Sequence, residues 1–195
     1  MERRVLTIPN VLSIVRLVLL PVFGYLLLVR HAYGPAVAVL MVSGVSDWAD
    51  GKIARLVANQ SSRLGEVLDP LVDRVYMVAV PVMLAAAAIV PWWLVAVLLA
   101  RDAVLAATLP VLRARGVRAL PVTYVGKAAT FALMSGFPLV LLGQWDAVWS
   151  RVVGACGWAF VIWGTGMYLW SALLYLLQVR LVARRLPRTS GQAVG

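Results

Sequence analysis

The sequence contains two acidic runs, Asp47-Trp-Ala-Asp50-Gly-Lys-Ile-Ala-Arg55 and Gly65-Glu-Val-Leu-Asp69-Pro-Leu-Val-Asp73. The interval that they span holds five of the eight acidic residues of the chain. Asp47 and Asp50 are spaced i,i+3, and Asp69 and Asp73 are spaced i,i+4, so each pair shares one face of a helix. If the two helices pack as an antiparallel hairpin, the two pairs point toward each other.

The surrounding sequence is typical of a membrane protein. Hydrophobic residues make up 63% of the 195 residues and charged residues only 13%, with a mean hydropathy of +0.90. Soluble domains carry about 25% charged residues. A spanning helix needs about 20 mostly apolar residues. Such segments are predicted at 11–30, 34–57, 66–89, 92–112, 124–143 and 150–182.

We therefore predict an all-α, polytopic membrane protein with six transmembrane helices. Residues 1–186 would form a single catalytic domain that begins with a short interfacial segment at residues 2–8. Residues 187–195 would form a disordered cytoplasmic tail, because they are polar.

The basic residues predict the orientation in the membrane. With six spans both termini lie on one side, and 14 of the 18 basic residues fall on that side. Only Arg30 and Arg151 fall on the other side, so the termini are predicted to be cytoplasmic. The net charge of +10 is thereby explained without a nucleic-acid groove.

The four aspartates predict a metal site. A charged side chain near the centre of a bilayer costs about 2.5–3.5 kcal/mol on insertion scales, and facing carboxylates also repel one another. Hard oxygen ligands suit Mg²⁺ or Mn²⁺, and two such ions about 3.5–4 Å apart can clamp a phosphate during in-line displacement. Two alternatives stay open: Asp69 could cap a helix before Pro70, and Asp47 could pair with Arg63.

Other residues between the two runs suit a phosphorylated ligand. Gly51 and Gly65 carry no side chain, so a bulky ligand can approach the backbone closely. Lys52, Arg55 and Arg63 supply positive charge for phosphate groups. The alternative for Lys52 and Arg63 is the ordinary enrichment of basic residues on the cytoplasmic side.

Together the two runs resemble the signature of the CDP-alcohol phosphatidyltransferase family (class I). The one departure is that nine residues separate Arg55 from Gly65, where the family pattern usually has eight. Weaker motifs extend the likeness over about residues 5–180. Pro9-Asn10-Val-Leu-Ser13-Ile-Val-Arg16 resembles the family's entry to the first span. Arg101-Asp102 and Gly126-Lys127 resemble acceptor-side motifs of its branch of phosphatidylglycerophosphate and cardiolipin synthases. A second lysine that this branch often has is Ala129 here.

The resemblance implies an activity and a set of roles. Members transfer the phosphatidyl group of CDP-diacylglycerol to an alcohol and release CMP, usually as homodimers with a cytoplasmic active site. By position, Asp47, Asp50, Asp69 and Asp73 would bind two divalent cations, and Asp73 would also be the catalytic base. The residues that would cradle the cytidine diphosphate are Gly51, Ala54, Arg55 and Gly65.

The acceptor is predicted from the basic residues Arg101, Arg113 and Lys127. Arg101 lies within a span and needs a partner. Its neighbour Asp102 is an imperfect partner, because it points about 100° away around a helix. A phosphate of the acceptor would fit better. Glycerol 3-phosphate is therefore ranked first, phosphatidylglycerol (giving cardiolipin) second and inositol phosphate third.

Two other classes of protein are weighed against this enzyme. A transporter often shows repeated halves with broken helices, but the acids here cluster in one hairpin. An assembly protein would use isolated polar residues, not five acids in one short interval.

Four glycines near the end of the chain suit helix association: Gly154, Gly157, Gly164 and Gly166. Tight packing within one subunit is favoured over a dimer contact. Cys156 is interpreted as a small buried hydrophobic residue.

Overall fold

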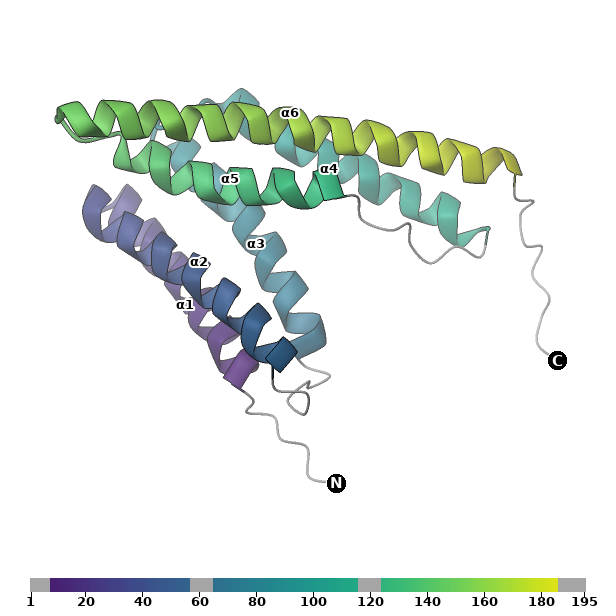
Figure 1. Cartoon of the computed structure of the whole chain (residues 1–195), viewed down its shortest axis with the longest axis horizontal. Helices are drawn as coiled ribbons and strands as arrows, with labels where there is room; N and C mark the ends of the chain where they lie inside the picture. Colours follow the sequence, from purple (N-terminus) through teal and green to yellow (C-terminus); the bar gives the residue numbers. More distant parts are fainter. Residues whose placement is uncertain (1–7, 57–64, 116–123, 186–195) are drawn as a thin grey trace, which may run out of the picture.

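The protein is all-helical. In a computed structural model, residues 8–56, 65–115 and 124–185 are described, with the backbone alone described at 8–10, 47–56, 65–70, 113 and 185. These residues form six α-helices and no strand (Figure 1). The helices are α1 (Ile8–Leu28), α2 (Tyr33–Leu56), α3 (Gly65–Ala86), α4 (Trp92–Arg113), α5 (Tyr124–Leu142) and α6 (Val148–Arg185).

The predicted fold class is confirmed, and each predicted helix is present within a few residues of its predicted bounds. By length and hydropathy, four of the described helices can cross a membrane: α1, α4, α5 and α6. The apolar part of α2, Tyr33–Ser46, is shorter. Side chains are described only up to Ser46 in α2 and only from Leu71 in α3, so the described part of each helix is shorter than a span. A count of six spans therefore stays a prediction.

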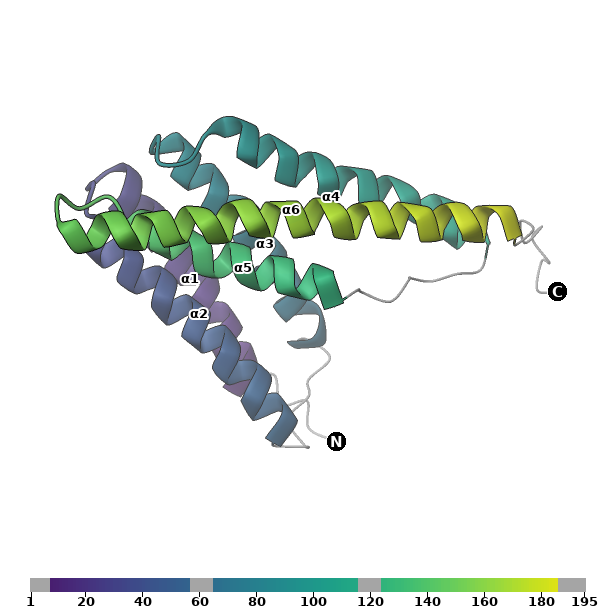
Figure 2. The ribbon, with the colours of Figure 1, turned by 45° about the horizontal axis from the view of Figure 1, so that its top comes forward.

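The helices converge at one end of the molecule. The turns between α1 and α2, α3 and α4, and α5 and α6 lie together at the left of Figure 2. From there α1 and α2 run toward the lower edge of the view, whereas α4 and α6 run to the right, so their far ends lie apart. Helix α3 joins the two groups, because it contacts α1, α4 and α5.

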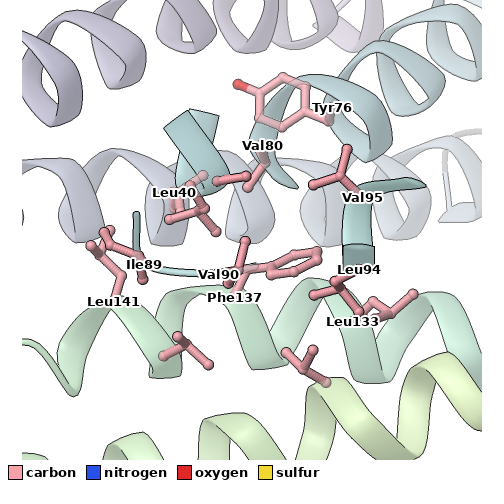
Figure 3. Close-up of a cluster of buried hydrophobic side chains, with 14 of the residues drawn as sticks. Leu40, Tyr76, Val80, Ile89, Val90, Leu94, Val95, Leu133, Phe137 and Leu141 are labelled. Carbon is pink, nitrogen blue, oxygen red and sulfur yellow. The ribbon is translucent and has the colours of Figure 1, made fainter. Parts of the chain in front are cut away.

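Residues of all six helices form the hydrophobic core, and Figure 3 shows the part where α2, α3, α4 and α5 meet. Leu94, Leu133 and Leu141 have at most 1% of their surface exposed, and they pack with Val80 and Phe137 (Figure 3). The outer faces of the helices are apolar too, with Trp163 70% and Trp170 56% exposed on α6. Such outer faces are expected where the surrounding solvent is lipid.

Helices α5 and α6 approach so closely that glycine is needed at the contact. A Cβ atom on Gly157 would lie 2.5 Å from the backbone nitrogen of Val140, and one on Gly143 would lie 2.6 Å from the Cα of Gly154. The interpretation as packing within one subunit is thus confirmed for Gly154, Gly157 and also Gly164, which packs against Leu133.

Two expectations about α6 need correction or completion. Gly166 is exposed and has nothing within 4 Å of an added Cβ, so it takes no part in the α5–α6 contact. Cys156 was expected to be buried, but it is exposed. Gly157 faces α5, so its neighbour Cys156 lies on a different face of α6. The exposed face of α6 is apolar and can hold a cysteine side chain.

The interfacial segment predicted at residues 2–8 lies outside the described residues except for Ile8, which begins α1. The tail predicted at 187–195 lies outside them as well.

Candidate active site

The four predicted metal ligands lie on α2 and α3. Asp47 is nine residues before Leu56, the last residue of α2, and Asp73 is eight residues after Gly65, the first residue of α3. At about 1.5 Å per residue, Asp47 lies about 12–14 Å from the last residue of α2, and Asp73 lies about as far from the first residue of α3. The two aspartates are therefore at similar distances from the adjoining ends of the two helices.

Most side chains of the predicted site lie outside the described set. This holds for Asp47, Asp50 and Asp69, for the predicted nucleotide-binding residues Lys52, Ala54 and Arg55, and for Arg63 altogether. Among the side chains that are described, no three metal-ligating groups come together. The assignment of metal and nucleotide ligands therefore remains a prediction, and Asp73 is the one ligand whose surroundings can be described.

Asp73 binds a buried arginine of α1. The Nη1 atom of Arg16 donates to Oδ1 of Asp73 at 2.8 Å, and the side chain of Arg16 is only 4% exposed. The hydroxyl of Tyr76 donates to the backbone carbonyl of Arg16 at 2.6 Å. Since its only proton is used there, the hydroxyl of Ser43, 3.0 Å away, is the donor to the Tyr76 oxygen. A polar chain thus connects α1, α2 and α3.

An apolar cavity lies beside this polar chain. It has a volume of about 570 Å³ and is bounded by α1, α2, α3 and α5. Arg16, Ser43 and Tyr76 form part of its wall, and most of the remaining wall is apolar. Two of its wall residues, Val45 and Phe131, are 63% and 71% exposed, so the cavity opens to the outside between α2 and α5.

The surroundings of Arg101 differ from the expectation. Its Nη1 atom donates a hydrogen bond to Oδ1 of Asp102 at 2.9 Å, and its Nη2 atom donates to the hydroxyl of Ser171 at 3.1 Å. The hydroxyl of Tyr168 donates to the same Asp102 oxygen at 2.7 Å, and the guanidinium carbon lies 3.9 Å from the centre of the Tyr168 ring.

Asp102 was expected to be an imperfect partner because it points about 100° away around the helix, but it pairs directly with Arg101. The long arginine side chain reaches its neighbour, and Tyr168 of α6 holds the carboxylate in place. One buried nitrogen, Nε of Arg101, has no hydrogen-bond partner in the part of the chain that the structure describes.

The other two predicted acceptor residues are placed only in part. Lys127 is exposed in the first turns of α5, with Nζ 5.9 Å from the centre of the Tyr124 ring. Arg113 is the last residue of α4, and its side chain is not described. Arg115 was not predicted to have a role, but its Nη2 atom donates to the carbonyl of Ala183 at 3.2 Å and ties the end of α4 to α6.

Comparison with known proteins agrees with the acidic motif. The family model of the CDP-alcohol phosphatidyltransferases matches residues 6–163. A Mycobacterium tuberculosis protein named "Putative cardiolipin synthase" is 61% identical over 98% of this chain and 91% of its own length. The cardiolipin synthase (CMP-forming) of Streptomyces coelicolor is 46% identical over 93% and 86%. The CDP-diacylglycerol–glycerol-3-phosphate 3-phosphatidyltransferase of Salmonella typhimurium is 32% identical over 89% and 94%.

Proposed function

Because the chain belongs to the CDP-alcohol phosphatidyltransferase family, we propose that it transfers the phosphatidyl group of CDP-diacylglycerol to phosphatidylglycerol, forming cardiolipin and CMP. That the chain is a phosphatidyltransferase of phospholipid biosynthesis follows from the family and from its relatives. The choice of acceptor is the proposal.

The single observation that carries this choice is the similarity to cardiolipin synthases. Two relatives with that name match nearly the whole chain at 61% and 46% identity, whereas the relative that uses glycerol 3-phosphate is 32% identical. This reverses the ranking made from the sequence alone. That ranking treated Asp102 as an imperfect partner of Arg101, but Asp102 pairs with Arg101 and offsets its charge. A singly charged phosphodiester needs less positive charge than a phosphate monoester.

The proposed reaction needs one proton acceptor. A free hydroxyl of the phosphatidylglycerol headgroup attacks the phosphorus atom that is esterified to the diacylglycerol. A new P–O bond forms, the bond from that phosphorus to the oxygen of CMP breaks with its electron pair, and the hydroxyl proton passes to Asp73. Direct attack is favoured because phosphoryl transfer depends mainly on positioning and charge neutralisation.

The donor set fits two divalent cations, Mg²⁺ or Mn²⁺. Asp47, Asp50, Asp69 and Asp73 provide only hard oxygen atoms, and hard oxygen is the ligand type that these ions prefer. When bound there, the ions would neutralise the diphosphate of the donor lipid. The proposed nucleotide ligands remain those expected from the sequence: Gly51, Lys52, Ala54, Arg55, Arg63 and Gly65.

The described residues support a lipid substrate at this site. Arg16 contacts Asp73 and also lines the apolar cavity, so a hydrocarbon chain in the cavity would bring its headgroup toward Asp73.

For the acceptor headgroup we propose Arg101, acting together with Asp102, and also Arg113 and Lys127. The second candidate acceptor, glycerol 3-phosphate, is favoured by the similarity to the Salmonella typhimurium enzyme.

An acceptor comparison tests the proposal. Purified protein is supplied with CDP-diacylglycerol, Mg²⁺ or Mn²⁺, and one acceptor at a time: phosphatidylglycerol, glycerol 3-phosphate or inositol phosphate. We expect phosphatidylglycerol to support the fastest CMP release, with cardiolipin as the lipid product. If glycerol 3-phosphate alone supports CMP release, the enzyme makes phosphatidylglycerophosphate and the proposed acceptor is wrong.

We also propose a homodimer in the cell membrane with both termini and the active site on the cytoplasmic side. The three short turns lie together at one end of the molecule, away from the start of α1 and the end of α6 (Figure 2). The 14 basic residues predicted for the terminal side support the orientation.

Cysteine labelling tests this orientation. The exposed Cys156 is first replaced by alanine, and Ser190→Cys or Asp146→Cys is then introduced. A membrane-impermeant maleimide added to intact cells should label the variant in the turn before α6, where Asp146 is exposed, and should spare position 190 until the cells are opened. Labelling with the opposite pattern would reverse the topology.

A further inference from the structure

Arg16 is a charged side chain in the middle of an apolar helix. It lies eight residues after the first residue of α1, and it is flanked by valine, leucine and isoleucine. Its guanidinium has almost no contact with solvent, since 4% of the side chain is exposed. A charge in such a place is retained only with a partner and commonly marks a functional site. Among the described side chains, Arg16 forms an ion pair with Asp73, the proposed catalytic base.

We propose that Arg16 is a positioning residue, which fixes the carboxylate of Asp73 in the orientation that accepts the proton of the attacking hydroxyl. This rests on the proposed function, because it assigns Arg16 a part in the same reaction. Rotation about the last side-chain bond of an aspartate has only broad, shallow preferences. A planar guanidinium that donates to one carboxylate oxygen at 2.8 Å restricts that rotation, because its donors point in fixed directions.

Tyr76 holds Arg16 at the required place. Asp73 and Tyr76 are three residues apart on α3, so both face α1. The side chain of Arg16 reaches Asp73, and the hydroxyl of Tyr76 reaches the backbone carbonyl of Arg16. Two hydrogen bonds one helical turn apart therefore join the same residue of α1 to α3. They fix both the distance and the rotation of α1 relative to the carboxylate.

Ser43 completes the arrangement from α2. Its hydroxyl donates to the oxygen of Tyr76 and is itself buried, with 2% of the residue exposed. Through this chain the helix that carries Asp47 and Asp50 is connected to the helix that carries Asp73. A purely structural ion pair would affect the stability of the fold and not kcat of the folded enzyme, so the two roles can be separated by kinetics.

The test compares Arg16→Gln with Arg30→Gln, a control that removes the same charge from an exposed position after α1. CMP release is measured over a range of CDP-diacylglycerol and phosphatidylglycerol concentrations. We expect kcat to fall about 10- to 100-fold in Arg16→Gln, the scale on which a misplaced catalytic group reduces rate. The KM values for both lipids should change little, and Arg30→Gln should behave like the wild type.

A double-mutant cycle separates positioning from a general structural effect. If Arg16 acts through the carboxylate of Asp73, Arg16→Gln should cause no further loss of kcat in an Asp73→Asn background. The same fractional loss in both backgrounds would overturn the proposal, and so would a normal kcat or a rise confined to KM in Arg16→Gln alone.

A milder variant keeps the test decisive if Arg16→Gln fails to fold. Tyr76→Phe removes the hydroxyl that holds the backbone of Arg16, and we expect kcat to fall about fivefold, which corresponds to about 1 kcal/mol of activation free energy. An unchanged kcat in folded Tyr76→Phe would contradict the proposal. If the wild type releases no CMP with any acceptor, the proposed function fails and this inference fails with it. If the wild type is active but the variants give the contradicting results, only the role of Arg16 fails.

Discussion

Replacing Asp73 with asparagine should lower the turnover number by at least about 100-fold, the low end of what a positioned acid–base group contributes. The amide keeps the shape of the side chain but can neither accept the proton of the acceptor hydroxyl nor offer a negative oxygen to a divalent cation. The effect is measured as the rate of CMP release at saturating CDP-diacylglycerol and phosphatidylglycerol. The Asp146→Asn variant, changed in the exposed turn between α5 and α6, serves as the control and should retain its rate.

A metal titration of the same variant separates the two roles assigned to Asp73. If Asp73 is the base, a saturating concentration of Mg²⁺ or Mn²⁺ should not restore the rate of Asp73→Asn. Full recovery at high metal would mean that only metal affinity was lost, so that Asp73 is a ligand but not the base. Normal activity of Asp73→Asn at low metal would contradict both roles.

Replacing Gly157 with alanine should strongly destabilise the protein. The new Cβ atom would lie 2.5 Å from the backbone nitrogen of Val140 and 2.8 Å from the carbonyl carbon of Leu139. These are backbone atoms, which cannot move aside as a flexible side chain can, so α5 and α6 must separate. Overpacking of this kind reduces the free energy of unfolding by about 1–3 kcal/mol, and sometimes by more. The variant should also melt at a lower temperature in detergent.

Gly166→Ala is a matched control on the same helix. Nothing lies within 4 Å of a Cβ atom at this position. Alanine is favoured over glycine in a helix by about 1 kcal/mol, so this variant should melt at the same or a slightly higher temperature. Equal destabilisation by the two substitutions would show that the α5–α6 contact is not the close approach described above.

The positions of the helices could be predicted from the sequence because apolar segments are bounded by prolines and charged residues. The predicted segment 124–143 and the observed helix α5 (Tyr124–Leu142) differ by one residue. The acidic site could be proposed for a similar reason, since its aspartates occur at helical spacings within one hairpin. Which helices cross the membrane is harder to predict, because α2 and α3 mix apolar segments with the charges of the motif.

The partners of the buried arginines could not be predicted from spacing. In the sequence Arg16 stands only at the end of a motif in the first predicted span, and Asp73, with which it pairs, is 57 positions away. For Arg101 the sequence offered only Asp102 as an imperfect partner, whereas in the structure Tyr168 and Ser171 of α6 complete its surroundings. Such contacts depend on how helices rotate about their axes when they pack. The signal that could have drawn attention to Arg16 was the cost of a buried charge, which requires a counter-ion somewhere in the fold.

The central claim is metal-dependent transfer of a phosphatidyl group, and the balance of its two products tests this claim most directly. Purified wild-type protein is supplied with CDP-diacylglycerol labelled in its phosphatidyl part, phosphatidylglycerol and Mg²⁺ or Mn²⁺, and CMP and labelled cardiolipin are both quantified. We predict equal molar amounts of the two products, both falling to background when a chelator removes the divalent cation. Release of CMP without a labelled cardiolipin product, or product formation that persists in the chelator, would contradict the account.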